Sequence, residues 1–169
     1  MERIHPQPAA DERTVITEYL DYHRQTVLLK ADGLDRAQLN QRLEPSDLTL
    51  AALIKHLAYV EDHWIQVRFL GATSPEPWAS APFDDDNDWE LHSAADDDPD
   101  DLRALYEAAC QRSRVSLEGV PLDQLSVGLN KDGEQWNLRR ILVHLIEETA
   151  RHNGHADFIR QSIDGAVGD

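Results

Sequence analysis

The sequence predicts an all-α protein: an irregular four-helix bundle with one long crossover loop. Four stretches repeat apolar residues at the three- and four-residue spacing of an amphipathic helix, and no segment shows convincing strand alternation. Glycine and proline lie at the ends of these stretches, where they stop helices. The 169 residues are enough for one substantial core, so we expect a single domain over residues 1–169.

The first half of the chain contains two of the long helices. The first is expected over residues 11–31, before Gly33. A short helix over residues 35–43 should follow and end at Pro45. The second long helix is expected over residues 49–70, because its apolar residues recur at helical spacing.

Residues 72–98 form the long connection between the two halves. Its prolines and the acidic run at residues 84–90 (DDDNDWE) argue against a packed helix. Trp78 and Trp89 indicate that the connection folds over the bundle, while we expect the acidic run to stay in solvent.

The second half supplies the other two helices. One is expected over residues 99–118, with Pro99 in its first turn. A turn at Asp132 and Gly133 precedes the last, expected over residues 137–163. That helix would be about 40 Å long and would cross the whole domain.

The charge balance excludes some partners. Thirty-two acidic residues against sixteen Lys and Arg give a net charge of -16. This field repels phosphate backbones and anionic lipid, so nucleic acid and membrane surfaces are not expected partners. It also favours neutral over anionic substrates. No apolar run approaches the ~20 residues of a membrane span, and the N-terminal segment does not read as a secretory signal. We therefore expect a cytoplasmic protein.

Cys110 is the only cysteine, which rules out an intramolecular disulfide and a zinc site built from cysteines. It lies among Tyr106 and Ala109 in the third long helix. We expect it to be a buried thiol that packs as a small hydrophobic residue.

The last helix has the most informative pattern, within residues 141–160 (ILVHLIEETARHNGHADFIR). At helical spacing, His144, Glu148, His152 and His155 fall within about 80° of one another. Ligands four residues apart on a helix can hold one metal ion when another helix completes the set.

His56 on the second long helix is the candidate for that remaining ligand. It lies in an apolar stretch, where an imidazole needs a partner for its nitrogens. A hydrogen-bonded core histidine would also satisfy that need. Glu148, His152 and His155 would likewise be ordinary residues of a solvated face. Spacing alone leaves both readings open.

Three segments resemble the DinB-like metalloprotein superfamily and look closest to its actinobacterial branch. They are residues 45–50, IKHLAYVEDHW, and HLIEETARHNGHADFIRQSIDG, and the likeness spans nearly the whole chain. The resemblance implies a four-helix bundle with three metal ligands, which fall here on His56, Glu148 and His152. Many members of the superfamily have histidine at the position of Glu148. A glutamate ligand there resembles the one in mycothiol-dependent maleylpyruvate isomerase.

The other histidines receive weaker assignments. His155 is expected to line the site and contact a cofactor, and His144 to support a ligand or replace one. We expect His63 and His92 to be structural or exposed, while His23 is left undecided.

Three ligands leave a coordination position open, as in catalytic zinc sites. An open position of this kind, together with the resemblance, leads us to expect a metal-dependent thiol transferase; the resemblance implies that the thiol added to the electrophile is mycothiol or a similar small thiol. Zinc is the expected ion, and nickel also suits these donors. The alternatives are a non-catalytic metal- or ligand-binding stress protein and a metal-dependent hydrolase. No catalytic side chain is assigned, and a homodimer is the one protein association considered.

Overall fold

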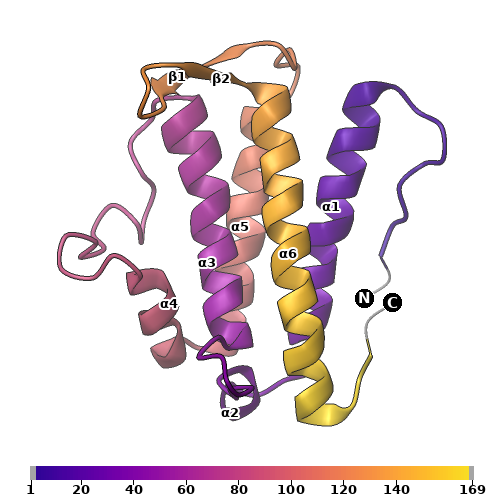
Figure 1. Ribbon diagram of the computed structural model, residues 1–169, viewed down its shortest axis with the longest axis vertical. Coiled ribbons are helices and arrows are strands. Elements are labelled where there is room, and N and C mark those ends of the chain that lie inside the picture. Colours follow the sequence, from indigo (N-terminus) through magenta and orange to yellow (C-terminus); the bar gives the residue numbers. More distant parts are fainter. Residues whose placement is uncertain (1–2, 168–169) are drawn as a thin grey trace.

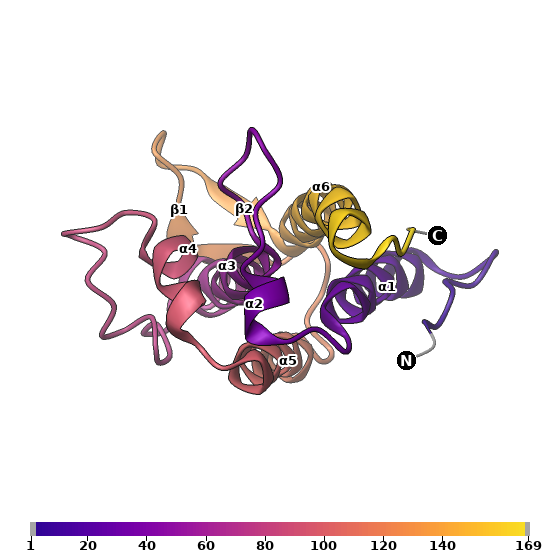
Figure 2. The same cartoon turned by 90° about the horizontal axis from the view of Figure 1, so that it is seen from below.

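Four long helices stand side by side in the computed structural model, which describes residues 3–167 (Figure 1). They are α1 (Glu12–Ala31), α3 (Leu50–Asp62), α5 (Pro99–Ser116) and α6 (Leu138–Asp164). Figure 2 shows them end on, with α1 packed mainly on α6 and α3 mainly on α5. The all-α, four-helix prediction is confirmed.

Side-chain caps explain where the long helices begin. Asp11, Thr49, Asp98 and Asn137 each accept a hydrogen bond from a backbone N–H in the first turn of the helix that follows. Such caps satisfy N–H groups that lack a partner within the helix. Gly165 ends α6 with φ 78°, a conformation that favours glycine.

The second long helix changes its winding after Asp62. Residues His63–Phe69 form a π-helix, η1, which continues α3 without a break. A π-helix bonds each N–H to the carbonyl five residues earlier, and such segments are frequent at functional sites. The sequence predicted one regular helix over residues 49–70 and gave no sign of this change.

The short helix after α1 is shorter than predicted. Helix α2 covers only Arg36–Leu39, whereas residues 35–43 were expected. The side chain of Asn40 donates to the carbonyl oxygen of Arg36 at 2.9 Å. Asparagine competes in this way with the backbone bonds that would extend a helix.

The long connection covers the bundle, as predicted, but it is not free of helix. It contains α4 (Trp89–Ser93) and a 3₁₀ turn, η2 (Ala94–Asp96). Trp78 is 3 % exposed, and its indole N–H donates to Oδ2 of Asp62 at 2.8 Å. Asp62 is fully buried and also accepts two hydrogen bonds from Arg112. This carboxylate therefore ties the connection to both α3 and α5.

A short hairpin precedes α6, so the expectation that the chain has no strand is wrong. Strands β1 (Leu125–Leu129) and β2 (Gln135–Asn137) pair antiparallel at the top of the bundle (Figure 1). β1 does alternate, but in an unusual sense: its apolar side chains are exposed and Ser126 is buried. Ser126 Oγ accepts from the backbone N–H of Trp136 at 3.0 Å.

Two glycines let this hairpin lie against η1. A Cβ atom on Gly71 would come within 2.6 Å of the Val127 side chain, and one on Gly128 within 2.7 Å of the Arg68 carbonyl oxygen. Only glycine permits such close approach. The hairpin is thereby packed onto the π-helical segment.

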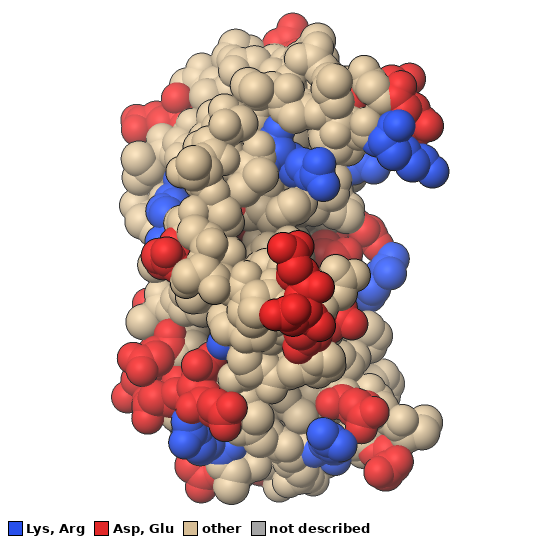
Figure 3. All heavy atoms as spheres, turned by 90° about the vertical axis from the view of Figure 1, so that its left-hand side faces the viewer, with Lys and Arg blue, Asp and Glu red and all other residues tan. Residues whose placement is uncertain are grey.

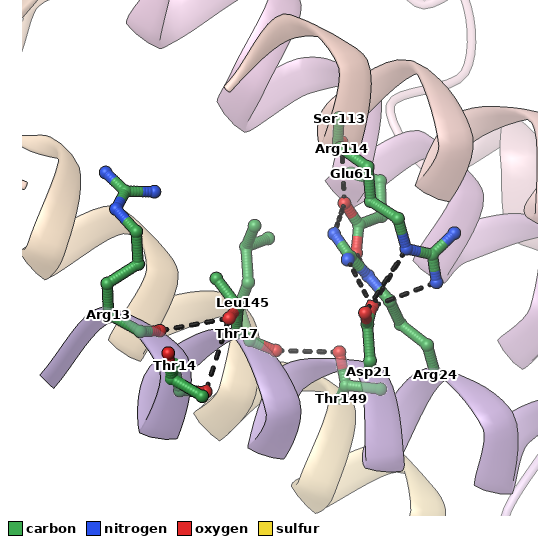
Figure 4. A network of polar contacts seen from close by, with 10 residues as sticks. All are labelled: Arg13, Thr14, Thr17, Asp21, Arg24, Glu61, Ser113, Arg114, Leu145 and Thr149. Carbon is green, nitrogen blue, oxygen red and sulfur yellow. Dashed lines mark hydrogen bonds and ion pairs between the residues drawn. The ribbon is translucent and has the colours of Figure 1, made fainter. Parts of the chain in front are cut away.

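Two apolar clusters make up the core, and a buried polar layer separates them. The guanidinium of Arg24 on α1 donates two hydrogen bonds of 2.6 Å to Glu61 on α3. Ser113 on α5 adds a third bond to Glu61, and Asp21 also pairs with Arg24 (Figure 4). No helix among the described residues is long and apolar enough to cross a membrane.

Candidate metal centre

His56, Glu148 and His152 converge from α3 and α6 on one point. Oε1 of Glu148 lies 3.6 Å from Nε2 of His56 and 3.2 Å from Nε2 of His152. One donor atom from each residue lies within 4.8 Å of the other two. Helices α3 and α6 are neighbours, so two residues one turn apart on α6 face one residue on α3 (Figure 1).

These separations suit a small divalent ion. Zinc bonds to histidine nitrogen and carboxylate oxygen are about 2.1 Å long, which puts two ligand atoms of a tetrahedral site about 3.4 Å apart. The two observed separations lie on either side of this value. The three side chains are 13–21 % exposed, so the group is shielded yet reachable.

Glu90 contacts the ring nitrogen of His56 that points away from Glu148. Its Oε1 lies 2.9 Å from His56 Nδ1, and its side chain is 4 % exposed. A carboxylate on the outer nitrogen fixes the ring and leaves Nε2 available to bind an ion, an arrangement that is usual for metal-binding histidines. Oε2 of Glu90 is buried and has no hydrogen-bond partner among the described residues.

Sequence reasoning missed Glu90 because it ends the acidic run that was expected to stay in solvent. The rest of the run does stay largely exposed. The available signal was local: Glu90 lies between Trp89 and Leu91, which pack against the core. That pattern differs from the all-polar residues before it.

His152 has an outer partner too. Its Nδ1 lies 3.4 Å from Nδ1 of His155, whose residue is exposed. His155 therefore borders the three donors through His152, and its expected contact with a cofactor stays a prediction.

The electrostatics couple the three residues. Burial lowers the pKa of His56, but Glu90 and Glu148 outweigh this effect and raise the pKa overall. Burial and the neighbouring His56 lower the pKa of His152. Burial raises the pKa of Glu148, yet His152 and His56 outweigh it and lower that pKa. The two carboxylates, one at each ring nitrogen, thus favour the protonated form of His56, and a metal ion at Nε2 would compete with the proton on that nitrogen.

His144 does not join the three donors, although it shares their face of α6. Its ring packs on Trp64 of η1, with centroids 4.5 Å apart. Its Nδ1 lies 3.6 Å from Oε2 of Glu147. With Glu147 and Glu148 it forms a second close group, which keeps His144 beside the centre.

Aromatic side chains form a wall next to the centre. The ring of Tyr59, one turn after His56, lies 5.0 Å from Phe83 and 5.4 Å from Trp78 of the covering connection. Burial and the charge of Glu90 raise the pKa of Tyr59, so its hydroxyl stays protonated. The covering connection thus contributes both the wall and Glu90.

The remaining histidines and the cysteine lie apart from the three donors. His63 is half-buried and bonds to Arg68, while His92 is exposed and pairs with Asp86. Burial lowers the pKa of His23 on α1. Cys110 is 3 % exposed, and burial raises the pKa of its thiol to about 12, as fits the expected buried thiol.

Charge is unevenly distributed around the covering connection. Figure 3 shows the molecule from that side, with acidic side chains clustered over its middle and lower parts and basic side chains prominent in the upper part. The upper part carries the hairpin and η1 (Figure 1). The net charge of the chain therefore does not describe every part of its surface.

Solved structures share this fold. A conserved protein from Enterococcus faecalis aligns with a TM-score of 0.71 at 17 % identity, covering 94 % of this chain and 100 % of its own. A mycothiol-dependent maleylpyruvate isomerase aligns at 0.55 and 20 % identity, over 82 % of this chain and 59 % of that one. A mutant of a mycothiol-dependent maleylpyruvate isomerase aligns at 0.57 and 18 % identity, over 90 % and 62 %. No curated protein sequence matches the chain.

A family model supplies the identification. The model of the mycothiol S-transferase family matches residues 15–165, from the second turn of α1 to the cap of α6. The matched region contains all three donors and Glu90. The chain belongs to the mycothiol S-transferase family.

Proposed function

We propose that the protein is a metal-dependent thiol transferase that joins mycothiol, or a similar small thiol, to an electrophilic small molecule. The observation that carries the proposal is the convergence of His56, Glu148 and His152, with Glu90 on the outer nitrogen of His56. Family membership and the mycothiol-dependent relative of the same fold support the choice of thiol.

The donor set indicates a catalytic use. Two imidazoles and one carboxylate would hold a zinc or nickel ion and leave a position for an exchangeable ligand. When bound, such an ion lowers the pKa of a coordinated thiol. A free thiol has a pKa of about 8.5 and is mostly protonated at neutral pH, and only the thiolate is nucleophilic.

The reacting thiol must come from a small molecule. Cys110 is buried, and its pKa of about 12 keeps it protonated. In the proposed reaction the sulfur of the small thiol forms a bond to carbon of the electrophile. The leaving group departs with its electron pair, and the thiol proton passes to solvent. His56, Glu148 and His152 position the centre, and the aromatic wall around Tyr59 limits access of water.

Metal content tests the first half of the proposal. We expect wild-type protein loaded with zinc or nickel to retain about one ion per chain, and each of His56→Ala, Glu148→Ala and His152→Ala to retain much less. His92→Ala is the matched control, since His92 is exposed and distant in the chain from the donors. Equal metal in wild type and all three variants, measured by elemental analysis, contradicts the assignment.

Turnover tests the second half. Metal-loaded and metal-stripped protein should be compared with mycothiol and a panel of electrophiles that includes 1-chloro-2,4-dinitrobenzene. We expect loss of thiol only with the loaded protein, and Glu148→His should change the rate while a metal site persists. Turnover without thiol would favour the hydrolase. The absence of any metal-dependent thiol loss would favour the binding protein.

A further inference from the structure

Two arginines lie beside the indole rings of Trp64 and Trp136, and Trp64 packs on His144. Arg68 on η1 and Arg140 in the first turn of α6 form no ion pair with any carboxylate among residues 3–167. The chain has thirty-two acidic residues and sixteen Lys and Arg residues, so most basic side chains have carboxylates to pair with. An unpaired guanidinium in such a chain is available to an anion from outside.

Arg68 is held so that its outer nitrogens are free. Its Nε donates to Nε2 of His63 at 3.0 Å. Burial and the charge of Arg68 lower the pKa of His63, which keeps the ring neutral and able to accept this bond. The two residues are five apart, and the π-helical winding of η1 places residues at that spacing on one side. Nη1 and Nη2 have no hydrogen-bond partner in the part of the chain that the structure describes.

Two indoles connect the arginines. The Cζ atom of Arg68 lies 6.0 Å from the ring centroid of Trp136, and that of Arg140 lies 5.9 Å from that of Trp64. The two indole rings are 5.3 Å apart at 75°. The result is a cationic site with aromatic walls, to which β2, η1 and α6 all contribute.

This site adjoins the metal donors. His144, whose ring lies 4.5 Å from that of Trp64, belongs to the close group that includes Glu148. A row of contacting residues thus runs from Glu148 through His144 and Trp64 to Arg140, and continues from Trp64 through Trp136 to Arg68. A small molecule with one end at the donors and the other at the arginines would lie along this row.

We propose that Arg68 and Arg140 bind a carboxylate on one of the two small-molecule substrates, with Trp64 and Trp136 beside the body of that molecule. The assignment of its other end to the metal donors rests on the proposed function, but anion binding does not. The local charge thus reverses the expectation, drawn from the net charge, that neutral electrophiles would be preferred.

Matched ligand pairs test the site by binding alone. We would titrate metal-loaded and metal-stripped protein with 3-nitrobenzoate and 3-nitrobenzamide, following tryptophan fluorescence and heat. A second pair, N-acetylcysteine and N-acetylcysteine amide, tests whether a thiol with a carboxylate binds more tightly than the same thiol with an amide. We expect the carboxylate of at least one pair to bind about tenfold more tightly than its amide, in both metal states. The pair that shows this preference identifies which substrate carries the anion.

Variants assign the preference to the two arginines. Arg140→Gln and Arg68→Gln should each reduce it about tenfold, and Arg68→Lys should retain part of it because the charge remains. Arg42→Gln is the control: it removes the same charge just after α2 and should leave the carboxylate preference unchanged. Arg140 is exposed, so its replacement should not disturb the fold.

Three results would overturn the inference. They are equal binding of acid and amide in both pairs, an equal loss in Arg42→Gln, and a preference that disappears on metal removal but survives both glutamine variants. The last result would place the carboxylate on the metal ion. A carboxylate preference without thiol transfer would contradict the proposed function but would still support this inference.

Discussion

Glu90 shows how much one side chain adds to the candidate metal centre. It is the one ionisable residue of the acidic run that is buried, and its carboxylate contacts the outer nitrogen of His56. Burying a carboxylate is costly unless it is hydrogen-bonded or paired. Its place in the fold is therefore best explained by the histidine, and through it by a cation at the centre.

Replacing Glu90 tests this interpretation. We expect Glu90→Gln to keep a hydrogen bond to His56 but lose the negative charge, and to weaken zinc binding about 10- to 100-fold. Competition with a chromophoric zinc chelator measures the affinity. Glu76→Gln, an exposed change in the same connection, is the control and should bind like wild type. Unchanged affinity in Glu90→Gln would show that the carboxylate does not support the site.

At the scale of elements, the hairpin and the π-helical segment act as one unit. The hairpin lies against η1, with Gly71 facing Val127 and Gly128 facing the backbone of Arg68. It also supplies Trp136, whose ring lies beside Arg68. An element that the sequence did not predict therefore positions one side of the proposed anion site.

Gly128→Ala tests this contact. The added Cβ would lie 2.7 Å from the carbonyl oxygen of Arg68, so the hairpin or η1 must move. We expect a loss of stability of about 1–3 kcal/mol, typical of overpacking, and a weaker carboxylate preference. Gly154→Ala is the matched control: it lies in α6 with open space around it and should raise stability by up to about 1 kcal/mol. Chemical denaturation measures both, and no difference between them would contradict the close packing.

At the scale of the whole molecule, the buried Arg24–Glu61 pair joins three helices. Arg24 is 4 % exposed and Glu61 2 % exposed, and Ser113 bonds to the same carboxylate. The pair lies between the residues of the two apolar clusters along α1, α3 and α5. Polar groups at this depth fix the register of the helices only if all are satisfied.

Replacing only one partner of the Arg24–Glu61 pair should lower the free energy of unfolding more than replacing both. We expect Arg24→Met to lower the free energy of unfolding by about 3–5 kcal/mol, because Glu61 is left buried and unpaired. The double change with Glu61→Leu should recover much of that loss. Arg42→Met, which breaks an exposed pair with Asp47, should cost no more than about 1 kcal/mol. A single variant as stable as the double would contradict this account of the pair.

The sequence by itself predicted the long helices and the candidate donors that the fold brings together. Caps, apolar spacing and terminal glycines are local signals, so the four helices were predicted to within a few residues of their observed ends. The spacing on α6 similarly indicated that Glu148 and His152 share a face, because a helix fixes the direction of residues four apart. The apolar surroundings of His56 made it the candidate from another helix, and the resemblance to a metalloprotein family then implied that all three residues are ligands.

The tertiary structure decided what depends on contacts between distant segments. Glu90 lies 34 residues from His56, and no local pattern states which carboxylate will meet that ring. The π-helical winding of η1 and the hairpin against it likewise arise from packing, since Gly71 and Gly128 matter only once Val127 and Arg68 lie beside them. Net charge is a sum over the whole chain, whereas the charge met by a ligand is set by neighbours in space. For that reason the sequence predicted neutral substrates, whereas in the fold neither Arg68 nor Arg140 pairs with a carboxylate among residues 3–167.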